Sequence, residues 1–320
     1  MSRIIGKTLQ PGDEIVTTWL DHYANVSSWQ ALEENGVLVK QARFDPETFK
    51  LDLDHLASLL SSKTKLVAVG LASNAIGTIN PIAKIAALAH NVGALLYVDA
   101  VHYAPHGPID VQALGCDMLV CSVYKFFGPH VGLLWGKKAV LESLPVYQVS
   151  AAPKTVPQKF ETGMPNYEGL AGATAAINYL ASVGQEFGSR FADELSQYQD
   201  RRRHLKQAMH AISLFERNLF TNLMEQLQTI PKITIFGITD PKEFEHRCPT
   251  VAFTVNGYTP IEVAKILGEQ NIFVWDGNFY AQGVTEQLGL EAAGGLVRAG
   301  LAHYNTQEDV NRFITALKAL

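Results

Sequence analysis

The chain has 320 residues, which is enough for a large core and two domains, and its composition is that of an ordinary globular protein. Its net charge of −5 arises from interspersed acidic and basic residues, so there is neither a basic stripe for nucleic acid nor a polybasic membrane patch. Cys116, Cys121 and Cys248 are odd in number and lack C-x-x-C spacing, so neither a disulfide framework nor a zinc site is indicated. We therefore expect small-molecule chemistry.

The amino-terminal residues MSRIIGKTLQPGDEIV lack the apolar stretch of a secretory signal, and no segment is long enough to span a bilayer. We expect a cytoplasmic protein with no membrane and no nucleic-acid partner.

From residue 12 to about 140, short β-branched runs alternate with helical patterns, which is typical of an α/β fold with a mostly parallel sheet. The runs are long and apolar, so we expect a sheet covered on both faces. The predicted strands are 14–18, 37–44, 65–73, 94–101, 117–124 and 131–136. The predicted helices between them are 25–36, 53–62 and 81–93.

Residues 145–165 are rich in proline and polar groups and predict a long excursion. Two long helices are expected at 166–184 and 186–229. A smaller α+β unit then closes the chain, with strands near KITIFG, TVAFTV, IFVWDG and GLVRAGL. We expect a large domain over 1–210 that includes the connecting helices, and a small α+β domain over 211–320.

Polar side chains follow three of the apolar runs in the first half of the chain. Asp99 ends ALLYVD, Asn74 follows GLAS, and Lys125 follows LVCSVY. Ligands bind outside the carboxyl ends of the strands in open α/β sheets, so we expect these groups to face one crevice.

One cofactor matches an acid, a hydroxyl cluster and a lysine at such a crevice. Pyridoxal 5'-phosphate (PLP) needs a lysine for its Schiff base and an acid that keeps its pyridine nitrogen protonated. Lys125 and Asp99 fit these two roles. Ser122 could donate to the phosphate, and a flat side chain such as His22 could cover the ring.

Each of these residues also has a structural interpretation. A strand-end aspartate commonly caps a turn, a lysine after a strand is commonly a surface charge, and His22 could be a solvated residue at a helix start. The glycine patterns of dinucleotide and P-loop sites are absent from the sequence. The histidines and aspartates of 90–106 alternate in direction along a strand, so we predict no metal site there.

At this point the residues resemble a known family. The stretch YVDAVHYAPHGPIDVQALGCDMLVCSVYKFFGPHVGLLWG is similar to the lysine-bearing region of class V aminotransferases, in the cysteine desulfurase-like branch of the fold-type I PLP enzymes. The likeness extends over nearly the whole chain. It implies that Lys125 forms the internal aldimine, Asp99 pairs with the pyridine nitrogen and Ser122 binds the phosphate.

Three further segments carry the resemblance. PGDEIVTTWLDHYANVSSWQ implies that His22 stacks on the ring, and SNAIGTINP implies that Asn74 lies near the ring hydroxyl. GGLVRAGLAHYNTQEDVNRF implies that Arg298 grips the substrate carboxylate, as a guanidinium does well. His102 occupies a position that is usually a glutamine facing the ring oxygen, and Tyr124 one that is commonly a phosphate-binding histidine.

The sequence departs from the family in three places. Residues 270–297 contain no cysteine where the desulfurases carry their nucleophile; the chain has DGNFY there, and Cys248 is a poor substitute. Met164 follows Gly163 where the family often has Gly-Thr reaching the partner's phosphate, so Thr162 or backbone N–H groups would have to replace that contact. The family's Gly-Thr-rich phosphate turn has no equivalent before Pro11, so we expect that an amino-terminal piece is missing.

We therefore predict a PLP-dependent transferase or lyase that acts on a small amino acid through Lys125, with persulfide desulfuration disfavoured. We expect a homodimer in which 160–168 lies near the partner's site. Two alternatives stay open: a non-catalytic or truncated homologue that keeps the fold for binding or structure, and a cysteine desulfurase or lyase with an unorthodox nucleophile.

Overall fold

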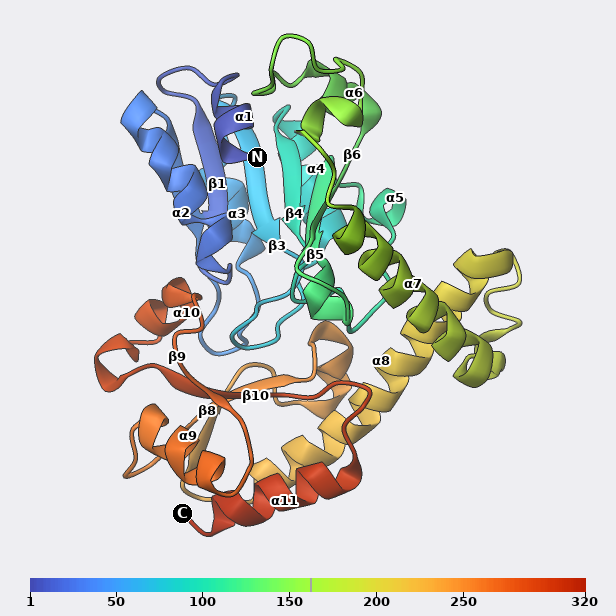
Figure 1. The fold of residues 1–320 in the computed structure, drawn as a ribbon. Coiled ribbons are helices and arrows are strands. Elements are labelled where there is room, and N and C mark those ends of the chain that lie inside the picture. Colours follow the sequence, from blue (N-terminus) through green and yellow to red (C-terminus); the bar gives the residue numbers. More distant parts are fainter. Residues whose placement is uncertain (162) are drawn as a thin grey trace.

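A computed structural model describes residues 1–161 and 163–320; Thr162, a candidate phosphate contact, lies outside the described residues. Two sheets make up the molecule, with the larger one above the smaller one in Figure 1. Long helices run beside them and link the two halves.

The large sheet contains six strands in the order β2-β1-β3-β4-β5-β6. Every pair is parallel except β5 with β6, so the expected mostly parallel sheet is confirmed. The strands are β1 Glu14–Thr18, β2 Leu38–Ala42, β3 Thr64–Gly70, β4 Leu95–Asp99, β5 Met118–Ser122 and β6 Gly132–Gly136. The chain moves from β1 outward to β2 and then to the other side of β1 for β3, which makes a topological switch point between β1 and β3.

Alternating side chains of these strands enter two different cores. Val67 and Val69 of β3 lie in the core that contains Leu56 and Ile85, from the helices of one face. Leu66 and Ala68 of the same strand lie in a second core, which includes Trp29 from the other face. The expectation of a sheet covered on both faces is confirmed.

The small sheet is antiparallel throughout, in the order β7-β8-β10-β9. Its strands are β7 Ile233–Phe236, β8 Thr250–Val255, β9 Trp275–Gly277 and β10 Leu296–Gly300. Each was expected within one of the four predicted segments.

The helices confirm most of the expected pattern. The α-helices are α1 Ser2–Gly6, α2 Ser27–Gln30, α3 Leu53–Leu59, α4 Ile82–Asn91, α5 Val111–Leu114, α6 Lys138–Ser143, α7 Tyr167–Phe187, α8 Asp200–Leu227, α9 Pro260–Glu269, α10 Gln282–Gln287 and α11 Gln307–Lys318. The 3-10 turns are η1 Tyr23–Asn25, η2 Ala31–Asn35, η3 Val123–Phe126, η4 Gln158–Phe160, η5 Ser189–Phe191, η6 Pro241–His246 and η7 Glu291–Ala293.

Two helix predictions need correction. The segment 25–36 is one turn of α-helix between 3-10 turns rather than one continuous helix. The second long helix begins at Asp200 and not near 186, because α7 extends to Phe187 and the chain then reverses through η5. Residue 210, the expected end of the large domain, lies inside α8.

Candidate functional site

All eight residues singled out in the sequence line one cavity of about 440 Å³. It lies beyond the carboxyl ends of β1, β3, β4 and β5, beside the switch point of the large sheet, and residues of the small sheet close its other side. The eight residues are His22, Asn74, Asp99, His102, Ser122, Tyr124, Lys125 and Arg298. The same cavity is also lined by Asp21, Trp275, Phe279 and Tyr280, which the sequence did not single out as site residues.

Lys125 lies on η3, directly after β5 ends at Ser122. Val123 and Phe126, on either side of the lysine, are buried in a core shared with α7 and α8, so the turn that carries Lys125 is firmly packed. The Lys125 Nζ makes no hydrogen bond or ion pair with any described residue. Its ammonium lies 5.2 Å from the centroid of the neighbouring Tyr124 ring.

Asp99 is the last residue of β4, where its Oδ1 accepts a hydrogen bond of 2.9 Å from the Val101 N–H. Burial raises the pKa of this carboxyl, and the Val101 N–H and the Lys125 ammonium act against that rise. The carboxyl is thus held at a strand end by one backbone contact, with its charge only partly compensated.

A second carboxyl, Asp21, lies almost fully buried on the same cavity. Its Oδ2 accepts hydrogen bonds from the Thr18 N–H at 3.1 Å and the Thr18 hydroxyl at 2.6 Å, and its Oδ1 accepts one from Asn25 Nδ2 at 3.2 Å. Burial, with a smaller contribution from Asp99, raises the pKa of Asp21 to about 7. A Cβ on Gly70 would lie 2.9 Å from Asp21 Oδ1, so β3 ends in a glycine where this carboxyl needs the space.

His22 follows Asp21 and caps η1, because its Nδ1 accepts a hydrogen bond of 3.1 Å from the Ala24 N–H. This contact leaves the proton of the neutral ring on Nε2. Burial lowers the pKa of His22, and the nearby Lys125 and Arg298 lower it further. The cavity therefore presents a neutral, flat imidazole.

Arg298 and Asn74 join the two sheets across the cavity. Arg298 Nη1 donates to the Asn74 carbonyl at 2.6 Å, and the guanidinium lies 4.6 Å from the centroid of the Phe279 ring. Arg298 forms no ion pair with any carboxylate in the described part of the chain. Asn74 Nδ2 donates to the Phe279 carbonyl at 2.8 Å, whereas Asn74 Oδ1 is buried without a hydrogen-bond partner among the described residues.

The phosphate-binding candidates lie together at the β5 end of the cavity. Ser122 ends the strand, and Tyr124 stacks on His130 with ring centroids 5.0 Å apart. Tyr124 is exposed, with an accessible ring beside Lys125. Both hydroxyls are thus available to a ligand.

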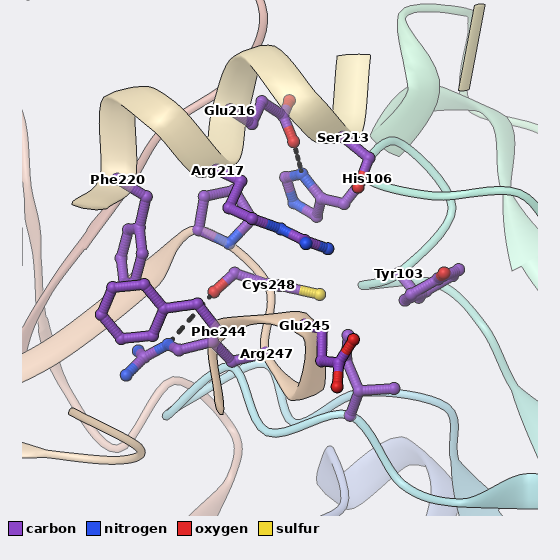
Figure 2. A pocket seen from close by; sticks show the side chains of 12 residues that line it. Tyr103, His106, Ser213, Glu216, Arg217, Phe220, Phe244, Glu245, Arg247 and Cys248 are labelled. Carbon is purple, nitrogen blue, oxygen red and sulfur yellow. Dashed lines mark hydrogen bonds and ion pairs between the residues drawn. The ribbon is translucent and has the colours of Figure 1, made fainter. Parts of the chain in front are cut away.

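His102 connects the cavity to a second pocket, of about 90 Å³, shown in Figure 2. Its Nε2 lies 3.1 Å from the Thr250 hydroxyl, and its ring meets that of His106 edge to face at 5.6 Å between centroids. Burial lowers the pKa of His102 well below its usual value, with smaller effects from His106, Arg298 and Lys125. Figure 2 shows His106 paired with Glu216, and Nδ1 and Oε2 lie 2.8 Å apart.

Comparisons with known proteins agree with this geometry. The model of the family described as "Aminotransferase class-V" matches residues 2–206 and 202–313. The chain belongs to the class V aminotransferase family. No helix of the described residues is long and apolar enough to cross a membrane.

Curated relatives of this chain include two differently named proteins. A probable cysteine desulfurase from Synechocystis is 33% identical over 97% of this chain and 70% of its own length. The aminotransferase-like protein FGM3 from Gibberella zeae is 38% identical over 97% of this chain and 73% of its own.

Solved structures confirm the fold. The cysteine desulfurase CsdA from Escherichia coli superposes with a TM-score of 0.81 at 26% identity, covering 99% of this chain and 74% of that one. The apo cysteine desulfurase from Thermococcus onnurineus has a TM-score of 0.83 at 26% identity, with coverage of 99% and 75%. The family consists of PLP-dependent enzymes, and the names of these relatives divide between desulfurases and aminotransferases.

The thiols of this family member do not line the candidate site. None of the three cysteines is among the residues described as lining the cavity. Cys248 is buried in the pocket of Figure 2, and burial raises the pKa of its thiol. Burial also raises the pKa values of Cys116 and Cys121 to about 11, which disfavours the thiolate form in each case.

The residues present fit the cofactor of class V aminotransferases. Asn74 Oδ1 lacks a partner in the described structure, Lys125 and Arg298 face the cavity without an ion pair to any described carboxylate, and Asp99 lies partly buried at a strand end. A cavity of about 440 Å³ is within the range that small-molecule sites occupy. Among the described residues, no group of three His, Cys, Asp or Glu side chains is placed to hold a metal ion.

Proposed function

We propose that this chain is a PLP-dependent enzyme that acts on an amino acid and holds the cofactor covalently through Lys125. The observation that carries the proposal is the convergence of Lys125, Asp99 and Arg298 on one cavity. The lysine comes from η3, the carboxyl from β4 and the guanidinium from β10 of the other sheet. Three groups of the right chemistry, from three separate parts of the sequence, meet where α/β sheets bind ligands.

When bound, PLP supplies a protonated pyridine ring that accepts electrons from the substrate's α-carbon. Asp99 would face the ring nitrogen, and a proton held on that nitrogen would compensate the carboxylate, whose pKa is raised mainly by desolvation. The neutral imidazole of His22 would cover the ring, and Asn74 Oδ1 would accept from the ligand. Ser122 and Tyr124 would donate to the phosphate.

Arg298 would bind the substrate carboxylate. Its guanidinium is fixed by the Asn74 carbonyl and by the face of Phe279, and it keeps donors free for a bidentate contact. Burial lowers the pKa of Arg298, as expected of a cation that awaits an anion, although a guanidinium remains charged at neutral pH.

Lys125, once released by exchange with the substrate amine, would act as the general base. Its Nζ in the amine form accepts the proton from the substrate's α-carbon and can return it elsewhere on the bound substrate. The firmly packed η3 turn keeps the lysine stem in position while the ammonium end moves.

Persulfide chemistry is disfavoured within this proposal. The segment 270–297 lacks a cysteine, and the three thiols of the chain have raised pKa values and positions outside the cavity lining. Transamination, elimination and racemisation are the reactions left for the same set of groups.

The test is a covalent one. Protein purified with added PLP is reduced with borohydride, digested and mapped by mass spectrometry. We expect one pyridoxyl group on Lys125 that is lost in Lys125→Ala and retained in the control Lys138→Ala, whose side chain is largely exposed. A pyridoxyl group on another lysine, or on none, would refute the proposal.

A homodimer and a cytoplasmic location remain predictions. The dimer is supported by large apolar side chains exposed in or beside the 145–165 excursion, with Val149 74%, Met164 81% and Tyr167 61% accessible. Light scattering of the holoenzyme should give twice the chain mass of 35.1 kDa, and a monomer would contradict it.

A further inference from the structure

We propose that the segment Trp275–Tyr280 forms an aromatic wall that selects an amino acid with a large apolar side chain, aromatic above all. This inference rests on the proposed function, because it uses Arg298 as the carboxylate site. It departs from the sequence expectation of a small amino acid, and it assigns a role to the stretch that stands where the desulfurases carry a nucleophilic cysteine.

Strand register places the wall beside the carboxylate site. Trp275 of β9 pairs directly with Arg298 of β10 in the antiparallel ladder, so both side chains project from the same face of the sheet. Phe279 lies against the guanidinium at 4.6 Å, and all three side chains line the cavity. A substrate whose carboxylate contacts Arg298 therefore has its α-carbon within reach of these rings.

The backbone of the wall is held in a costly conformation. Phe279 and Tyr280 have φ values of 56° and 58°, and two consecutive side-chain-bearing residues in the left-handed region are strained. Backbone contacts to the large sheet's loops stabilise them: the Tyr23 N–H donates to the Tyr280 carbonyl at 2.6 Å, and Asn74 Nδ2 donates to the Phe279 carbonyl at 2.8 Å. Strain fixed in this way at a cavity indicates that the position of the rings matters.

Two of the three rings, those of Trp275 and Tyr280, also remain unburied by the protein itself, whereas Phe279 is buried. Trp275 is 62% exposed and Tyr280 is 70% exposed, and Tyr280 touches the His22 ring only at a tilt, with centroids 5.6 Å apart. Large aromatic faces left accessible at a cavity gain free energy when an apolar group covers them. An aromatic substrate side chain would cover them more fully than a methyl group.

Charge argues against an acidic side chain. Among the described lining residues, Lys125 and Arg298 carry the only permanent positive charges, and the proposed function assigns one to the cofactor and the other to the α-carboxylate. A second carboxylate on the substrate would meet Asp21, Asp99 and the aromatic wall instead.

The test measures binding without turnover. Dissociation constants of 3-phenylpropanoate, propanoate and succinate, which lack an amino group and cannot react, are measured by NMR titration of the holoenzyme. We expect 3-phenylpropanoate to bind about tenfold more tightly than the other two, as an aromatic contact of this kind provides. Trp275→Ala and Tyr280→Ala should abolish most of the preference for 3-phenylpropanoate over propanoate, while the dissociation constant of propanoate changes little.

A matched control lies two residues before this segment. Phe273 is 85% exposed and does not line the cavity, so Phe273→Ala should keep the ratio. Equal affinities for the three acids, or a ratio unchanged in Trp275→Ala and Tyr280→Ala, would overturn the inference. Borohydride labelling of Lys125 in the same samples separates this result from failure of the proposed function, which would remove the label itself.

Discussion

Two neighbouring pockets of this molecule are rich in titratable side chains, and they differ in how their charges are compensated. In the pocket of Figure 2, His106 pairs with Glu216, and buried Arg247 donates to the carbonyls of Ile76, Ile238, Cys248 and Thr250. In the larger cavity, Lys125 and Arg298 have no carboxylate partner among the described residues. The chain's own hydrogen bonds hold His106, Glu216 and Arg247 in the first pocket, whereas Lys125 and Arg298 keep donors free for a ligand in the second.

This difference distinguishes charged residues that stabilise the fold from charged residues that are available to a ligand. Burial lowers the pKa of Arg247 to about 9, yet its hydrogen bonds lie between segments of the two sheets and hold the fold together. Arg298 keeps free donors toward an open cavity. Arginine substitutions in the two pockets should therefore affect different measurements.

The largest effect is expected at the cavity lysine. Lys125→Ala removes the proposed general base, so turnover of an amino-acid substrate should fall by about 10² to 10⁴. The thermal midpoint should change little, because the Lys125 side chain is exposed and makes no described contact that stabilises the fold. If unfolding temperature fell and turnover did not, Lys125 would belong with the structural charges.

Arg247→Met tests the other pocket. Removing the guanidinium leaves buried carbonyls without donors, so the free energy of unfolding should drop by about 3 kcal/mol or more. Denaturant unfolding measures this loss, and a variant as stable as the natural protein would show that the contacts carry no net stability.

Arg298→Lys should separate binding from stability. A lysine keeps the charge but loses the bidentate geometry, so KM for an amino acid should rise by about tenfold with a smaller change in kcat. Steady-state kinetics give both constants. Arg247→Lys is the matched control, for which we expect lower stability and an unchanged KM; the reverse pattern would contradict the division between the pockets.

A pH-dependent effect on stability is expected at Asp21, whose carboxyl accepts hydrogen bonds from Thr18 and Asn25. Its pKa is 3.8 when unfolded and about 7 when folded, so the folded state binds more protons between these values. Stability contributed by this group therefore falls as pH rises from about 4 to 7. Asp21→Asn abolishes this slope, so the thermal midpoint of the variant relative to the natural protein should rise with pH over that window.

Asp110→Asn provides the control for that pH series. Backbone N–H donors at the start of α5 lower the pKa of Asp110, so both its folded and unfolded values lie below the window. The difference in thermal midpoint between Asp110→Asn and the natural protein should be constant between pH 5 and 7. A flat line for Asp21→Asn as well would mean that Asp21 is ionised throughout.

The sequence predicted the central strands well because they are buried on both faces and carry unbroken apolar runs. It also predicted the groups at strand ends, since Asp99 and Lys125 follow such runs directly and parallel strands end at one edge. The start of α8 was missed, because 188–199 has a mixed pattern and its turn follows from the packing of α7 against α8.

Asp21 and the aromatic wall could not be found in the same way. Asp21 stands next to His22, but its burial depends on Gly70, distant in the sequence. Trp275 lies at the site because it pairs with Arg298 of the neighbouring strand. The local sequence does not specify that strand register. The local sequence signal for the aromatic wall is DGNFY, which stands where the desulfurases carry a cysteine.

Helix α8 acts as a strut of fixed length between the two halves of the site. Its 28 residues span about 42 Å. In its first half, Met209 and Ile212 share a core with Val123 and Phe126 beside the lysine. Towards its end, Leu223 and Leu227 enter the core of the small sheet that carries Arg298. The distance between Lys125 and Arg298 is thus set by a helix outside the cavity. A residue inserted into α8 would therefore lower activity by changing that distance, without altering any group that contacts the substrate.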